Sequence, residues 1–113
     1  MTNLLYELFI DTSKTNETLV ALVCDGERYE KKEARSFHTS QEVLPMIEIL
    51  LREHARALSD ITAITVVRGP GSYTGLRVGI AIASILSMLL HVPINGQAPG
   101  TPIAPQYEND PWK

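Results

Sequence analysis

The sequence contains a glycine-rich segment, 69–79, between an apolar β-branched run (61–67) and a long apolar run (76–90). This order predicts a strand, a tight turn and a helix. Such a turn can bind phosphate, because free backbone N–H groups at a helix N-terminus attract an anion. Neither nucleotide motif fits, since the lysine of a P-loop is missing and Gly75 comes one residue too late for the dinucleotide fingerprint. The phosphate-binding hypothesis is therefore weak.

A second explanation for the glycines is close packing. Gly75, Gly79 and Ala83 recur every fourth residue, so they share one face of the predicted helix. Small residues at this spacing allow two helices to approach closely. The helix is apolar nearly all round, which is typical of burial on more than one side. Either a partner or the other helix of the same domain covers the second side. A membrane span is not expected, because the apolar stretch 78–88 is shorter than the ~20 residues that a bilayer needs.

Asp11, Thr12 and Ser13 follow a predicted strand and are the second segment that could support chemistry. They are weak candidates for cofactor binding, because no second carboxylate motif accompanies them. We favour the alternative that they close a turn at the end of the strand. The three histidines and the single Cys24 lack the spacing of metal ligands. We therefore expect no catalytic residue, no cofactor and no metal.

The bulk composition sets limits on the class of protein. A chain of 113 residues with 44% apolar residues is expected to form one globular domain. The formal charge of −3 gives no basic surface for unaided nucleic-acid binding. The N-terminus does not have the pattern of a secretory signal, so we expect a cytoplasmic protein.

The elements expected along the chain give the order βββαβαβ. Three strands precede a helix that runs from Thr39 to about Leu58, and two further strands flank the second helix. We expect a five-stranded mixed sheet of the α/β class with two main helices, in a lobe that comprises residues 1–96. The Pro-rich tail, 97–113, is expected to be extended or disordered. The predicted strands are 4–10, 18–24, 27–37, 61–67 and 92–95.

The first predicted helix has more apolar surface than one sheet can cover. Leu44, Ile47 and Leu51 form a stripe on one face, and further apolar residues widen it. Together with the second helix, this predicts an interface with a partner. The candidate interface residues are Leu44, Ile47, Leu51, Tyr73, Gly75, Leu76, Gly79, Ile82, Ala83 and Leu86.

Three stretches of the sequence resemble the N-terminal lobe of the TsaB (YeaZ) family. They are Ile10–Ser13, His38–Ile47 and Gly69–Gly79, and the resemblance extends from residue 4 to about residue 96. It implies a single ribonuclease H-like lobe of the actin-like ATPase (ASKHA) fold.

The resemblance also implies a function. Members of the family are non-catalytic paralogues of TsaD and act in the N6-threonylcarbamoylation of adenosine 37 in tRNA. They pair with TsaD through two helices of this lobe, the ATPase TsaE joins the pair, and they can form a homodimer through a similar surface. We therefore expect a scaffold subunit that meets tRNA only within the complex and contacts no membrane. On this view Gly69, Pro70, Gly71 and Ser72 form a structural turn that aims the second helix. A bulky residue at Gly79 is expected to block pairing without disturbing the fold.

Family members usually continue into a second lobe of similar size, and nucleotide in actin-like folds binds between two lobes. A single lobe cannot close such a site, which disfavours one alternative, a fragment of an ATPase or small-molecule kinase. The other alternative, a glycoprotease-like peptidase, is disfavoured because its metal-binding histidine pair is missing.

Overall fold

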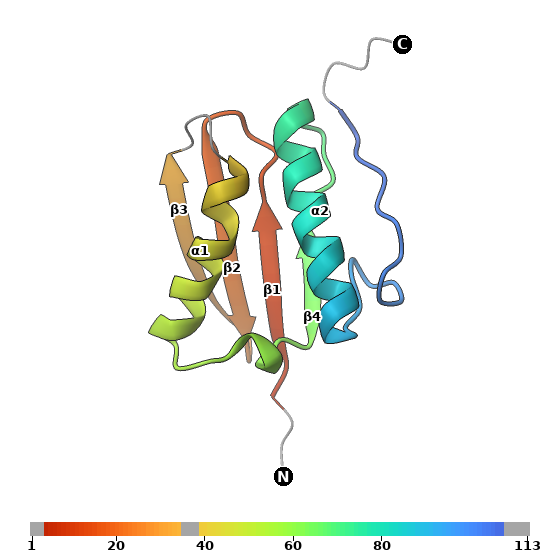
Figure 1. Cartoon of the computed structure of the whole chain (residues 1–113). Helices are drawn as coiled ribbons and strands as arrows, with labels where there is room; N and C mark the ends of the chain where they lie inside the picture. Colours follow the sequence, from red (N-terminus) through yellow and green to blue (C-terminus); the bar gives the residue numbers. More distant parts are fainter. Residues whose placement is uncertain (1–3, 35–38, 108–113) are drawn as a thin grey trace.

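The computed structural model describes residues 4–34 and 39–107, which form one sheet with two helices on the same face (Figure 1). The chain begins with three strands that run up and down as a meander. The first helix then crosses to the fourth strand, and the second helix follows it. The elements are β1 (Tyr6–Asp11), β2 (Glu17–Cys24), β3 (Glu27–Ala34), α1 (Thr39–Glu53), a short 3-10 turn (Leu58–Asp60), β4 (Ala63–Val66) and α2 (Tyr73–Leu90).

The sheet has the strand order β3-β2-β1-β4. β1 is its central strand, antiparallel to β2 and parallel to β4, so that Ile10 lies beside Val20 on one side and Val66 on the other. All three side chains are buried beneath the helices. Because side chains alternate along a strand, this register places an apolar row under the helices. The mixed sheet and the order of the elements as far as α2 are as predicted.

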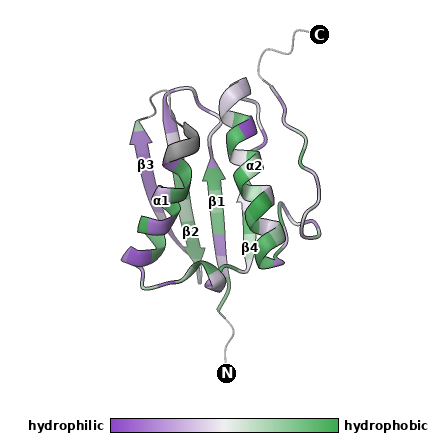
Figure 2. Ribbon diagram, viewed as in Figure 1, coloured by the Kyte–Doolittle hydropathy of each residue, from purple (hydrophilic) through white to green (hydrophobic). Residues whose placement is uncertain are grey.

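The core lies between the sheet and the helices. α1 covers β2 and β3, and α2 covers β1 and β4 (Figure 1). Figure 2 shows hydrophobic residues along β1, β2 and both helices, and a hydrophilic β3 at the edge of the sheet. In the part of the chain that the structure describes, no helix covers the opposite face. The largest fully buried side chains are Leu8, Ile10, Leu22, Ile47, Leu50, Ile64, Leu76 and Ile94.

One predicted boundary is wrong for a local reason. α1 ends at Glu53 instead of near Leu58, because Ala55 has a φ of 54° and turns the chain away from the helix. α2 begins at Tyr73, directly after the glycine turn, with Ser72 as its N-cap. The end of the third predicted strand, 35–37, lies outside the described residues.

The expected fifth strand is wrong, since the sheet has four strands. Only Ile94 forms a bridge to Ile64, because Pro93 has no N–H to donate and Asn95 turns out of the strand with a φ of 50°. The Asn95 side chain takes the place of the missing strand. Its Oδ1 accepts from the Val66 N–H at 2.8 Å, and its Nδ2 donates to the Val66 carbonyl at 3.1 Å.

Residues 97–107, here called the strap, begin with a turn at Ala98–Thr101 and then run extended beside α2 (Figure 1). The Gln106 N–H donates to the Arg68 carbonyl at 2.6 Å, and Tyr107 forms a bridge with Gly71. Ile103 packs against the core. Asn95 and the strap together bind backbone groups between β4 and the glycine turn. An uncovered sheet edge at this position could pair with another chain and aggregate.

The side chain of Asn95 is predicted to stabilise the lobe. Replacement by glycine keeps the positive φ but removes both hydrogen bonds to Val66, which leaves a partly buried N–H and carbonyl unpaired. We expect Asn95→Gly to lower the free energy of unfolding by about 1–2 kcal/mol in urea titrations. Gln97→Ala is the control, because it removes an exposed side chain close to Asn95 in the sequence. It should leave the midpoint of the urea titration unchanged. Equal midpoints for the two variants would contradict this role.

Candidate functional site

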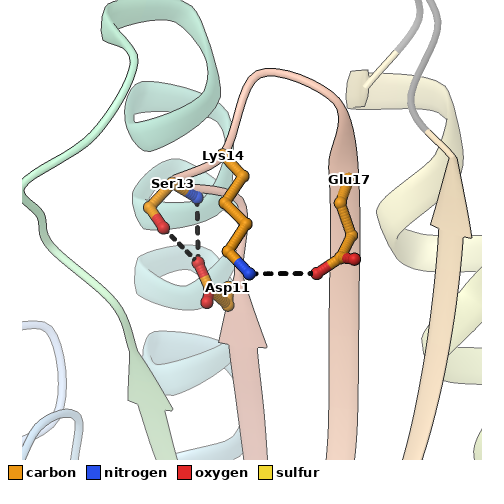
Figure 3. Close-up of polar contacts among 4 residues, drawn as sticks. All are labelled: Asp11, Ser13, Lys14 and Glu17. Carbon is orange, nitrogen blue, oxygen red and sulfur yellow. Dashed lines mark hydrogen bonds and ion pairs between the residues drawn. The ribbon is translucent and has the colours of Figure 1, made fainter.

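The loop after β1 forms a turn held by its own side chains (Figure 3). The Asp11 Oδ1 atom accepts from the Ser13 N–H at 2.9 Å and from the Ser13 hydroxyl at 2.6 Å. Lys14 lies above this turn and pairs with Glu17 of β2 across 3.6 Å (Figure 3). This is the turn that we favoured over a cofactor-binding loop.

Thr12, between these two residues, is fully buried and joins β1 to α2. Its hydroxyl donates to the Gly75 carbonyl in the first turn of α2 at 2.6 Å. A Cβ atom on Gly79, one turn further along α2, would collide with the Thr12 Oγ1 atom. The small residues of α2 therefore make room for the chain's own strand end. The expectation that Gly79 provides clearance for a partner, and that a bulky residue there spares the fold, is wrong.

The glycine turn connects β4 to α2 and is anchored at both ends. Ser72 is the N-cap of α2, where its hydroxyl accepts from the Gly75 N–H at 3.3 Å, and its own N–H donates to the Ser13 carbonyl at 2.9 Å. Gly69 has a φ of 134°, and a Cβ atom there would collide with the Gln106 carbonyl of the strap. The peptide bond between Gly69 and Pro70 is cis. The turn is therefore bound to the 11–13 loop and to α2 through Ser72, and it packs closely on the strap at Gly69.

The loop and the turn meet, but their polar groups bind each other. The Asp11 carboxylate binds Ser13, the Thr12 hydroxyl binds Gly75, and the Ser72 hydroxyl caps α2. Across residues 4–34 and 39–107, no three His, Cys, Asp or Glu side chains lie close enough together to hold a metal ion. In this structure Asp11 and Ser13 close the turn, and Thr12 joins the turn to α2.

A second group of titratable side chains lines a pocket of about 300 Å³ at the opposite end of the sheet, near Tyr6, Cys24, His54 and Arg56. Partial burial and a hydrogen bond with Cys24 raise the pKa of Tyr6 above its ordinary value. His54 Nδ1 lies 2.9 Å from the Leu50 carbonyl oxygen. Because a carbonyl oxygen only accepts, this ring nitrogen donates the hydrogen bond, just beyond the C-terminal end of α1. These contacts are structural in character.

One exposed apolar surface lies on the side of α2 that faces away from the core. Of the ten predicted interface residues, Leu44 and Tyr73 are exposed, at 48% and 57%, and Ile82 is half-buried. The other seven are buried in the interior of this chain, although two of them, Ile47 and Leu51, also line a groove beside α1. The seven are Ile47, Leu51, Gly75, Leu76, Gly79, Ala83 and Leu86.

The prediction missed the residues that the sheet leaves uncovered. Ile85, Met88 and Leu89 are 56%, 59% and 70% exposed, and with Tyr73 and Arg77 they form what we call the outer face of α2. A signal for this face was present in the sequence. Tyr73 and Arg77 each lie two residues from the glycine stripe, which is about 200° around a helix, so they occupy the opposite side.

A groove of about 570 Å³ runs along α1 toward the 3-10 turn. Leu44, Leu51 and Leu58 supply apolar side chains, and Arg52 forms an ion pair with Glu48 at its rim across 2.7 Å.

By length and composition alone, α2 could cross a membrane, with 18 residues and a mean hydropathy of 1.6. The core helix of a soluble protein meets the same criteria, and 39% of α2 is buried within this chain. The rest of α2 is not buried, so this core-like helix has one apolar side that the described residues leave uncovered.

The family of this lobe follows from its similarity to known proteins. The family model described as "TsaD: tRNA N6-adenosine threonylcarbamoyltransferase" matches residues 32–96, more than half of the chain. The chain belongs to the TsaB/YeaZ family, as its relatives show. It is similar to the tRNA threonylcarbamoyladenosine biosynthesis protein TsaB of Escherichia coli, with 39% identity over 89 residues, and to that of Haemophilus influenzae, with 37% over 87 residues.

Solved structures agree with this assignment. YeaZ from Pseudomonas aeruginosa superposes with a TM-score of 0.75 at 36% identity, over 80% of this chain and 42% of that one. The alignments with the two TsaB relatives cover 79% and 77% of this chain but 38% and 36% of those proteins. The chain thus corresponds to less than half of the length of the proteins that it matches.

The contact between Thr12 and Gly79 predicts that the effect of Gly79→Ala on the free energy of unfolding depends on residue 12, which a double-mutant cycle can measure. Gly79→Ala gains helix propensity, about 1 kcal/mol, but forces a buried threonine to move and lose its bond to Gly75. We expect a net loss of about 1–2 kcal/mol in the free energy of unfolding. In the Thr12→Ala background the obstacle is gone, so Gly79→Ala should be neutral or stabilising. An equal loss in both backgrounds would refute the contact.

Proposed function

We propose that this lobe is a non-catalytic TsaB-type subunit of the machinery that places N6-threonylcarbamoyladenosine on tRNA. It docks on TsaD through the outer face of α2 and the adjoining groove of α1. The observation that carries the proposal is the uncovered apolar side of α2 in a chain that belongs to this family. The family membership suggests the pathway, and the exposed apolar side chains suggest the docking surface.

Energetics favours an occupant for this face. Ile85, Met88 and Leu89 are more than half exposed, and each gains roughly 1–2 kcal/mol when its remaining apolar surface leaves water. They are neighbours along one side of a rigid helix, so a partner helix can bury them together. Tyr73 and Arg77 extend the face to the first turn and add an aromatic and a cationic side chain, which are common at interface hot spots.

The junction of the 11–13 loop with α2 supports a structural role over a catalytic one. The Asp11 Oδ1 atom and the Thr12 hydroxyl stabilise the turn and the helix that carry the docking surface. A mutation in this loop is therefore expected to act on TsaD binding indirectly, through the position of α2. The ATPase or kinase and the peptidase alternatives gain no support from the geometry of the described residues.

The remaining parts of the proposal follow from the family. TsaE joins the pair with TsaD, tRNA is met only within that complex, and the work takes place in the cytoplasm. In the absence of TsaD, a second copy of the chain is the alternative occupant of the same face.

A negative charge placed on the outer face of α2 should weaken the binding of TsaD. We expect Ile85→Glu and Leu89→Glu each to weaken the Kd for TsaD at least ~tenfold, because a carboxylate cannot be buried against an apolar partner. Both side chains are largely exposed, so the melting temperature should stay within a degree or two. Titration of labelled chain with TsaD by fluorescence anisotropy measures the effect.

Thr15→Glu is the matched control, because it adds the same charge at an exposed position in the turn between β1 and β2, which is not part of the outer face of α2. It should bind TsaD like the unaltered chain. If Ile85→Glu and Leu89→Glu bind as tightly as Thr15→Glu, the docking surface lies elsewhere.

A further inference from the structure

The strap follows α2 from its last turn back to its first (Figure 1). At the start, the Gly100 N–H donates to the hydroxyl of the fully buried Ser87 at 3.2 Å. Ile103 then packs against the core, and Tyr107 ends the strap beside the glycine turn. Burial alternates over its second part, 101–107, as in a docked strand, with Thr101, Ile103, Pro105 and Tyr107 half-buried and Pro102, Ala104 and Gln106 exposed.

The end of the strap contacts the outer face of α2. The Tyr107 ring lies 4.7 Å from the Tyr73 ring, centroid to centroid, with an angle of 32° between their planes. The Arg77 guanidinium lies 5.1 Å from the same Tyr73 ring, and its NH1 donates to the Tyr73 hydroxyl. Tyr73 is therefore a contact of the strap and also the first residue of the outer face.

We infer that the strap is a self-inhibitory contact of the lobe. Tyr107 covers part of Tyr73 that a partner on the outer face of α2 also needs, so the two compete for it. This inference rests on the proposed function, because it concerns access to the same docking surface. In the free lobe the strap shields the N-terminal end of the face, and docking requires that end of the strap to move aside.

The two ends of the strap differ in strength, which makes a partial release possible. The Gly100 end binds a fully buried hydroxyl, and Ile103 packs against the core. Beyond Ile103, the contacts are the ring pair, the Gln106–Arg68 backbone bond and a bond of 2.9 Å from the exposed Arg68 Nε to the Ala104 carbonyl. Each of these is modest and close to solvent, so this end opens more readily than the core.

Removal of the Tyr107 ring should strengthen docking. A partner that binds only the open state has an apparent Kd divided by the open fraction, so Tyr107→Ala should tighten the Kd for TsaD about 3–10-fold. Gln106→Ala is the matched control, because that side chain points outward and its backbone bond to Arg68 is kept. It should bind TsaD like the unaltered chain.

Hydrogen exchange gives a second readout. The Gln106 amide, which is bonded to Arg68, should be protected in the free lobe and should exchange faster in the presence of saturating TsaD. If the unaltered chain binds TsaD but Tyr107→Ala binds equally or more weakly, or if Gln106 stays protected in the complex, the strap does not compete and the proposed function stands. If neither the unaltered chain nor Tyr107→Ala binds TsaD, the proposed function itself is wrong.

Discussion

The contact between Thr12 and the first turns of α2 sets the orientation of that helix. The Thr12 side chain fits only because residue 79 has no Cβ, and its hydroxyl fixes the helix by donating to the Gly75 carbonyl. With the glycine side turned toward the end of β1, Leu76 and Ile80 point into the core. The same rotation sends Ile85 and Leu89 outward. The docking surface that we propose is thus a consequence of a buried contact on the other side of the helix.

The rest of the lobe leaves the helices as the surface suited to association. Asn95 and the strap bind the backbone from β4 onward, so that edge offers little to an added strand. β3 at the other edge carries charged side chains such as Arg28 and Glu30, which pair with each other. Apolar side chains exposed as neighbours on one helix are the reason why we propose α2 as the surface for a partner.

The polar residues that first suggested chemistry serve this architecture. Asp11 and Ser13 bind each other, and Ser72 binds both the loop and the helix it caps. A loop of this kind needs the same residue types as a phosphate site, because both rely on hydroxyls, carboxylates and free N–H groups at a helix start. Family membership and the local geometry lead to the same interpretation, in which the junction positions α2.

The sequence by itself determined the strand and helix order, the mixed sheet, the Ser72 turn before α2 and the family, because these depend on local periodicity and short motifs. It also determined that α2 is apolar on more sides than one sheet covers. Only the tertiary structure decided which side is free. Gly75, Gly79 and Ala83 could face a partner or the chain's own strand, and periodicity is the same in both cases. The end of β1 settles the choice, since Thr12 lies 63 residues from Gly75 in the sequence and meets it only in the folded lobe. For the same reason the sequence could not show that the Asn95 side chain would replace a fifth strand or that Tyr107 would meet Tyr73.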